Sequence, residues 1–229
     1  MGWEQAPSPF ITWAAALFVC LAPSGYPCLV TTITEAAAGV RDWPAFHPNI
    51  RAIVHSHWVP AAATVIDPLL DDDTGIEMLR DEPPRQILLS NRHHLRSSEE
   101  IAAEFGATIH CHRAGLHQFE DGPEVAGFDW GDEPAPGIEA LEVGVLCDEE
   151  TALLIRDAGA LAIADAITND DGELGFFADR LLGDDPEAVK SGIRDSFRAL
   201  LDRDFDTLLF AHGPPISGDG KDLLRDFCG

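Results

Sequence analysis

Residues 87–102, ILLSNRHHLRSSEEIA, decide how the rest of the chain is interpreted. The apolar run that ends at Ser90 is typical of a buried β-strand, and the segment from Ser97 onward is typical of a helix start. Between them lies a short loop with two adjacent histidines, His93 and His94. A loop that follows a strand holds its side chains at the rim of a sheet, where binding and catalytic groups are common. The stretch therefore raises the question of a metal site.

The surrounding pattern favours an α+β fold. Ser97 and Glu100 have the spacing of a capping box, and Gly106 is expected to end that helix. Two more helices are predicted at 185–203 and 220–227, the first with an apolar stripe along one face. Apolar runs typical of strands lie at 51–57, 61–67, 85–90, 106–112, 138–144, 151–157, 160–165 and 206–212. Strands outnumber helices, which indicates packed sheets with helices on their outer faces.

Composition excludes several classes of partner. Forty Asp and Glu stand against fifteen Lys and Arg, for a formal charge of -25. Such a surface repels nucleic acid and anionic membranes, which leaves a small-molecule ligand or a protein partner. The five cysteines are scattered and include no CxxC pair, which is typical of reduced thiols in the cytoplasm.

The amino-terminal forty residues are treated as a poorly defined extension, and 41–229 as a single domain. The apolar run at 10–23 has the length of a signal-peptide core, but no Lys or Arg precedes Arg41. Prolines and a glycine interrupt the run before it could span a bilayer. A cleaved signal segment stays open as the alternative to a loosely packed extension. Apolar runs near this end also leave room for a homodimer.

Two other predicted strands end in ligand-type side chains. Asp165 ends the run at 160–165, and His212 ends the run at 206–212. Zinc sites use three or four His, Cys, Asp or Glu donors, and a catalytic site keeps one position for water. Because His93 and His94 are adjacent, we expect only one of them to face a shared centre.

The order of these motifs resembles the metallo-β-lactamase fold hydrolases, including the glyoxalase II-like thioesterases. In that family a strand leads into an HxHxDH motif and a helix, and later strands end in Gly-Asp and in His-Gly. The stretches ILLSNRHHLRSSEEIAAEF, LEVGVLCDEETALLI, ALAIADAIT and TLLFAHGPP look like its elements. AAATVIDPLL, with Asp67, looks like the early strand beside the metal motif. The resemblance covers about 45–229 and implies an αββα sandwich of the metallo-β-lactamase type.

The resemblance is incomplete at the ligands. Asn91 stands where the motif's first His is expected, and His93 matches the second. Three more expected positions are replaced, by Leu95, Arg96 and Leu146, whereas the Asp and the final His are matched by Asp165 and His212. The resemblance therefore implies a degenerate, at most mononuclear site. It would hold one Zn or Fe ion on His93, Asp165 and His212, with Asp165 as the catalytic residue. Secondary candidates are His94, Asn91, Arg96 and Asp67.

The direction of Arg96 separates two classes of function. If its guanidinium points inward, it repels a divalent cation and forms a salt bridge with Asp165 in place of the metal. The chain is then a catalytically inactive relative that binds a small molecule or a protein. If Arg96 turns outward, His93, Asp165 and His212 remain to bind one metal ion that activates a water. That water would attack an ester, a thioester or an amide.

Other histidines and cysteines carry weaker signals. HCHRAGLH at 110–117 is rich in ligands, but its spacing matches no common zinc pattern. His55 and His57 are expected on a strand surface, with a pocket mouth as the alternative. Cys147 could substitute for the missing ligand at Leu146, but the acidic residues beside it do not favour a thiolate.

Overall fold

The chain divides into two units, Met1–Val30 and Thr31–Gly229. The computed structural model describes residues 20–21, 27–28, 32–71 and 75–229. In the first unit, β1 (Cys20–Leu21) pairs antiparallel with β2 (Pro27–Cys28). Most of the apolar run at 10–23 lies outside the described residues, and with it the alternative of a signal segment.

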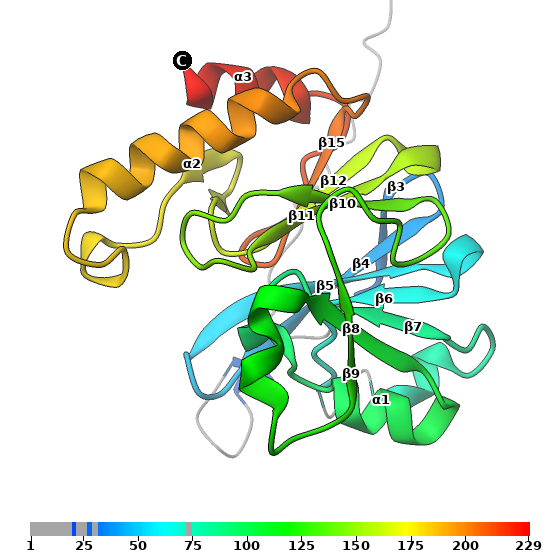
Figure 1. Cartoon of the computed structure of the whole chain (residues 1–229). Helices are drawn as coiled ribbons and strands as arrows, with labels where there is room; N and C mark the ends of the chain where they lie inside the picture. Colours follow the sequence, from blue (N-terminus) through cyan, green and yellow to red (C-terminus); the bar gives the residue numbers. More distant parts are fainter. Residues whose placement is uncertain (1–19, 22–26, 29–31, 72–74) are drawn as a thin grey trace, which may run out of the picture. The chain divides into compact units, whose positions relative to one another are not determined.

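The second unit contains a seven-stranded mixed sheet whose strands follow one another in chain order (Figure 1). The strands are β3 (Thr34–Ala37), β4 (Val40–His47), β5 (Ala52–Val59), β6 (Thr64–Ile66), β7 (Gln86–Leu88), β8 (Thr108–His112) and β9 (Val125–Phe128). Pairing is antiparallel from β3 to β6 and parallel from β6 to β9. The four strands predicted between 51 and 112 are confirmed. The sheet begins at Thr34, within the segment that the sequence analysis assigned to the extension.

A second sheet has four strands in the order β10-β11-β12-β15. They are β10 (Ile138–Glu142), β11 (Thr151–Ile155), β12 (Ala160–Ile163) and β15 (Thr207–Phe210). Only the pairing of β12 with β15 is parallel. A hairpin of β13 (Thr168–Asp170) and β14 (Glu173–Gly175) follows β12. Short 3-10 helices are η1 (Pro60–Ala62), η2 (Ile76–Leu79), η3 (Arg92–His94), η4 (Arg113–Phe119), η5 (Arg156–Ala158) and η6 (Asp179–Leu181).

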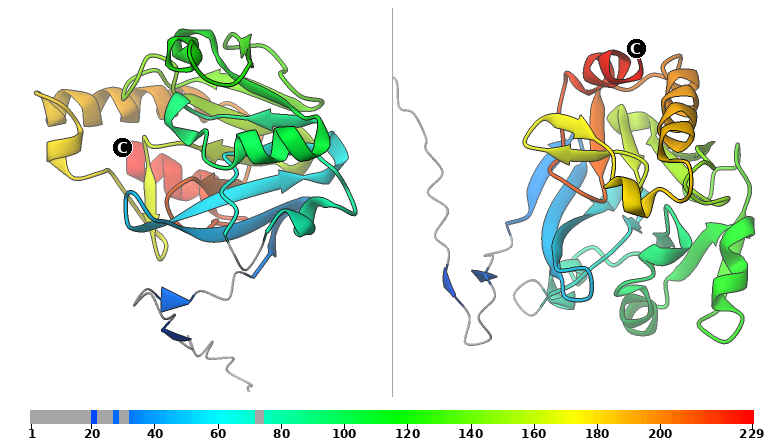
Figure 2. Two further views of the ribbon diagram at one scale, coloured as in Figure 1. Left: turned by 90° about the horizontal axis from the view of Figure 1, so that it is seen from below. Right: turned by 90° about the vertical axis from the view of Figure 1, so that its left-hand side faces the viewer.

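Helices cover the outer faces of both sheets (Figures 1 and 2). The short helix α1 (Ser98–Phe105) packs on the seven-stranded sheet, while α2 (Pro186–Leu200) and α3 (Gly220–Cys228) pack on the four-stranded one. Alternate residues of one strand face different layers: Ile87 packs toward α1, and Leu88 packs between the sheets. Burial on both faces explains the unbroken apolar runs of these strands. The predicted α+β fold with four layers is confirmed.

The helix boundaries follow their predicted signals only in part. Gly106 ends α1 in the left-handed region, with φ 69°, as expected. The prediction of a capping box is wrong. The Ser97 hydroxyl accepts a hydrogen bond from the Leu70 backbone amide at 2.9 Å and does not cap the helix. In α2, Asp185 caps the first turn by accepting from the Ala188 amide at 3.1 Å.

Strand β4 was not predicted, because Asp42 and Pro44 interrupt its apolar pattern. Strand β3 pairs only with Val40–Asp42, so beyond Asp42 this side of β4 has no partner strand in the described part of the chain. Proline is tolerated at such an edge.

No helix in the described residues is both long enough and apolar enough to cross a bilayer.

Candidate functional site

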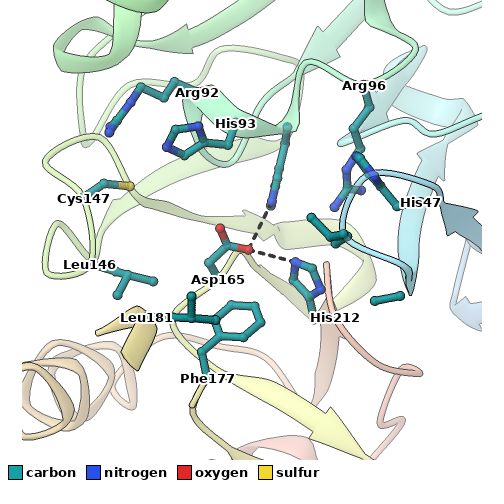
Figure 3. Close-up of a pocket in the computed structure, with 13 residues that line it drawn as sticks. His47, Arg92, His93, Arg96, Leu146, Cys147, Asp165, Phe177, Leu181 and His212 are labelled. Atoms are coloured by element: carbon teal, nitrogen blue, oxygen red, sulfur yellow. Dashed lines mark hydrogen bonds and ion pairs between the residues drawn. The ribbon is translucent and has the colours of Figure 1, made fainter. Parts of the chain in front are cut away.

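The candidate site lies where parallel strands of both sheets end. Asp67 directly follows β6, and the loop of η3 follows β7. Asp165 comes two residues after β12, and His212 two residues after β15. Because β6 and β7 are parallel, as are β12 and β15, their carboxyl ends bring these side chains together. Asp165, His212 and residues of the η3 loop border a cavity of about 490 Å³, and Figure 3 shows its lining.

Three side chains converge at the base of this cavity. The Nε2 atom of His94 lies 3.1 Å from Oδ1 of Asp165, and Nε2 of His212 lies 3.0 Å from the same oxygen (Figure 3). One ligand atom from each of the three lies within 4.8 Å of the others, and no other His, Cys, Asp or Glu group of the described chain meets that criterion. Two imidazoles and one carboxylate are a donor set that suits a single zinc or iron ion.

A second set of groups orients two of these three, His94 and Asp165. Asp67 is buried, and its Oδ2 lies 3.0 Å from Nδ1 of His94. Ser90 donates both its hydroxyl and its amide to the Asp67 carboxylate, the amide at 2.8 Å. Asn91 donates its amide to Oδ2 of Asp165 at 2.9 Å, which leaves Oδ1 facing the two histidines. A carboxylate behind a ligand histidine is the usual support of a protein metal site.

The structure brings His94, rather than His93, to Asp165 and His212. The side-chain oxygen of Asn91 accepts a hydrogen bond from the His93 backbone amide at 2.8 Å, so Asn91 caps the start of the 3-10 turn η3. Successive side chains in a 3-10 turn diverge by about 120°, so neighbouring histidines cannot share one centre. His93 is exposed and borders the cavity, while His94 is buried. Asn91 was a candidate oxygen ligand, but its side chain instead caps the η3 turn and donates a hydrogen bond to Asp165.

Arg96 takes neither of the two directions considered from the sequence. Its Nη1 donates to the carbonyl oxygen of His55 at 3.0 Å and to that of Asp67 at 2.7 Å. Asp165 forms its ion pairs with His94 and His212, so the expected salt bridge with Arg96 is absent from the described residues. Arg96 nevertheless borders the cavity (Figure 3). Burial lowers the pKa of its guanidinium, and the negative charges of Asp67 and Asp165 offset only part of that effect.

The cluster is strongly coupled by charge. Burial by itself lowers the pKa of His94, but Asp67 and Asp165 outweigh it and raise that pKa to about 9. Burial raises the pKa of Asp165, yet His94 and His212 hold it well below its usual range. Without a metal, the site is therefore an imidazolium held between two carboxylates.

Two residues near the site were missed from the sequence. Glu150 is buried, its Oε1 accepts the Ala166 amide at 2.5 Å, and burial and the charge of Asp165 raise its pKa to about 8. His47 borders the cavity from the end of β4. Burial and the charge of Arg96 lower the pKa of His47. No motif marks either residue, because Glu150 contacts Ala166, 16 positions later, and His47 reaches the cavity from the end of β4.

The remaining sequence candidates do not converge on a metal site in the described residues. The group at 110–117 separates: His110 contacts Gln86, and the His112 ring stacks on Trp130 at 4.2 Å between centroids. The expectation that His55 and His57 lie on a strand surface is wrong. Both are buried, with their Nδ1 atoms 2.9 and 3.1 Å from the Asp42 carboxylate.

Cys147 borders the cavity, but it has no character of a thiolate ligand. Burial and the charge of Glu150 raise the pKa of its thiol, so the neutral form is favoured.

The turn after His212 requires a glycine. Gly213 has φ 120°, and a Cβ at this position would lie 2.0 Å from the carbonyl oxygen of Asn169. The backbone amide of Asn169 in turn donates a hydrogen bond to the His212 carbonyl oxygen at 2.9 Å. The His-Gly pair therefore fixes His212 against strand β13.

Comparisons with known proteins give structural matches only, since no protein-family profile and no curated protein matches the sequence. A metallo-β-lactamase from Erythrobacter litoralis superposes with a TM-score of 0.61 at 15% identity, over 86% of this chain and 92% of that one. The mono-zinc form of the metallo-β-lactamase FIM-1 from Pseudomonas aeruginosa gives 0.62 at 15% identity, over 86% and 94%. The metal-soaked Flv1 flavodiiron core from Synechocystis sp. PCC6803 gives 0.61 at 11% identity, over 86% of this chain and 60% of that one.

Proposed function

Since the chain has the metallo-β-lactamase fold, we propose that it is a hydrolase with one metal ion held by His94, Asp165 and His212. The observation that carries the proposal is the convergence of two Nε2 atoms on Oδ1 of Asp165, at 3.1 and 3.0 Å. One of the similar structures is a mono-zinc form, which supports a single ion. In this proposal His94 takes the place that the sequence analysis assigned to His93.

The residues around the three ligands fit a metal. Asp67 lies behind His94 and Asn91 behind Asp165, so both ligands are oriented before an ion arrives. Arg96 opposes a cation by its charge, but two carbonyl oxygens hold its guanidinium. The donor set does not separate zinc from iron, so the ion is proposed as one Zn or Fe.

When bound, a divalent ion supplies Lewis acidity and a water that ionises near neutral pH, suited to attack on an ester, a thioester or an amide. The chain's own residues then position the reaction. Asp165 is the proposed catalytic carboxylate. The ring of Phe177 packs edge-on against His212, with centroids 5.0 Å apart, and shields it from water. His47 has a lowered pKa, so at neutral pH its imidazole is free to accept a proton at the cavity wall.

Metal loading combined with activity tests the proposal. The purified chain is loaded with zinc, manganese or iron, and bound metal and hydrolysis of ester, thioester and amide panels are measured. One ion per chain and metal-dependent hydrolysis are expected. Both should be lost in His212→Gln, which retains a polar side chain. Metal well below one ion per chain under every condition would contradict the proposal.

A second candidate is a metal-free relative that binds a small molecule or a protein. The observation in its favour is that Asp165 already has two histidine partners, and that His94 is stabilised as a cation by two carboxylates. In such a network the proposed metal ligands already have partners of opposite charge or hydrogen-bonding partners without an ion. The loading experiment separates the two candidates, because the metal-free relative gives no stoichiometric ion.

Several finer expectations stay predictions. These are a small-molecule substrate, a cytoplasmic location, a homodimer, and no role in nucleic-acid binding. The charge of -25 supports the last of these.

A further inference from the structure

One wall of the cavity presents a positive charge that no carboxylate pairs. Arg96 borders the cavity and forms no ion pair in the described part of the chain, since its Nη1 contacts only two backbone carbonyls. Arg92, the other arginine at the cavity, is paired with the Glu149 carboxylate. A guanidinium has five N–H donors, so Arg96 retains donors for a further acceptor. Arg96 is half-buried, and Asp67 and Asp165 act on its charge from a distance without forming a direct ion pair.

His47 adds a second polar group to the same wall. Its Nδ1 is buried and has no hydrogen-bond partner on any other described residue. The charge of Arg96 contributes to lowering the pKa of His47, and both side chains border the cavity (Figure 3). The His47 ring borders the cavity, and a neutral imidazole can donate one N–H to an acceptor there.

The mouth of the cavity is apolar. Four large hydrophobic side chains are exposed in the described residues, and two of them, Ile50 and Leu181, border this cavity with 54% and 57% of their surface exposed. Leu146 and Phe177 continue the apolar surface inward. Exposed apolar side chains that gather at one opening mark a binding site for an apolar group.

We propose that this cavity binds an amphipathic monocarboxylate, with the carboxylate on Arg96 and His47 and the apolar tail on Ile50 and Leu181. A planar carboxylate matches the fork of one free guanidinium, whereas a phosphate dianion would face the overall negative charge with a single counter-charge. As a substrate class, the inference rests on the proposed hydrolase: the substrate is an acyl compound with a non-reacting carboxylate. Binding itself does not depend on the metal.

Calorimetric titration of metal-free protein, dialysed free of chelator, tests the site with two probes of equal length. Octanoate is expected to bind at least tenfold more tightly than the neutral octanamide. Arg96→Gln should abolish this discrimination, whereas Arg85→Gln, at an exposed position outside the cavity, should leave it intact. Leu181→Asn should weaken both probes by a similar factor, because it removes only tail contacts. Circular dichroism checks that each variant is folded, and Arg96→Lys, which keeps the charge without the fork, should retain part of the discrimination.

Equal affinities for octanoate and octanamide in the wild type would overturn the proposal, as would unchanged discrimination in Arg96→Gln. The metal content of the same variants, measured after separate samples are loaded with zinc or iron, keeps the two proposals apart. A chain that binds one ion but does not discriminate the probes remains a hydrolase candidate without this subsite. A chain that discriminates them but binds no metal retains the subsite and loses the hydrolase.

Discussion

His94 lies between two carboxylates: its Nδ1 is 3.0 Å from Asp67 and its Nε2 is 3.1 Å from Asp165. The first contact holds the ring from behind, and the second places it beside His212. The same geometry serves a ligand histidine or a buried imidazolium. The choice between metal and proton at Nε2 therefore governs the behaviour of the site.

Metal-free protein should lose stability as the pH rises. The pKa of His94 is raised from an ordinary 6.5 to about 9, so its contribution is complete below pH 6.5 and is lost as the pH passes 9. The loss should reach about 3 kcal/mol between these limits. Denaturant unfolding at pH 6, 7.5 and 9 in the presence of a chelator measures it. A stability that does not change over this range, or one that changes equally in His94→Gln, would contradict the ion pairs.

Glu150→Gln should stabilise the protein at alkaline pH. Folding raises the Glu150 pKa from 4.5 to about 8, so at pH 8 the folded state either retains a proton or buries a charge that the unfolded state does not. Glutamine keeps an acceptor for the Ala166 amide without that cost. We expect a gain of about 2 kcal/mol or more at pH 8 and little change at pH 4.5. The exposed Glu142→Gln serves as the control, and an E150Q variant no more stable than it at pH 8 would argue against a protonated Glu150.

Gly213→Ala should destabilise the fold and loosen His212. The added methyl would lie 2.0 Å from the Asn169 carbonyl oxygen, and the backbone has φ 120°. We expect a loss of more than about 2 kcal/mol, together with weaker metal binding. Gly218→Ala is the matched control, because Gly218 also has a positive φ, 85°, but an added Cβ meets nothing within 4 Å. Equal unfolding free energies for the two variants would show that the contact with Asn169 is unimportant.

Arg96→Gln should bind the metal more tightly than the wild type. Removing a positive charge near a divalent ion relieves repulsion, and an increase in affinity of about tenfold is expected at low salt. Competition with a chromophoric chelator measures this affinity. An unchanged affinity would place the guanidinium too far from the ion to matter, and a lower one would show that Arg96 supports the ligands.

The fold could be predicted from the sequence because its central strands are buried on both faces. Ile87 and Leu88 face different layers and are both fully buried, which produces an unbroken apolar run. Strand β4 was not predictable in this way, since Pro44 and Asp42 break its pattern and the strand depends on its pairing with β5. The capping box failed for a similar reason, because Ser97 finds its partner in Leu70, 27 positions earlier.

The proximity of Asp165 and His212 could be predicted from the ends of their strands, whereas the side chain that the η3 turn presents to them could not. Asp165 and His212 follow strands that are parallel neighbours, so their proximity follows from topology. Whether His93 or His94 faces them depends on η3, which Asn91 caps, and on Asp67, which lies 27 positions before His94. These contacts are distant in sequence, and no local pattern encodes them.

Metal content of His94→Gln and His93→Gln, measured side by side with the wild type, shows which of the two histidines binds the ion. The substitutions are identical and adjacent, and of the two histidines it is His94 that contacts Asp165 and Asp67. We expect one ion per chain in the wild type and in H93Q, and a loss of at least tenfold in metal affinity in folded H94Q. Metal lost in H93Q but retained in H94Q would show that His93, and not His94, is the ligand.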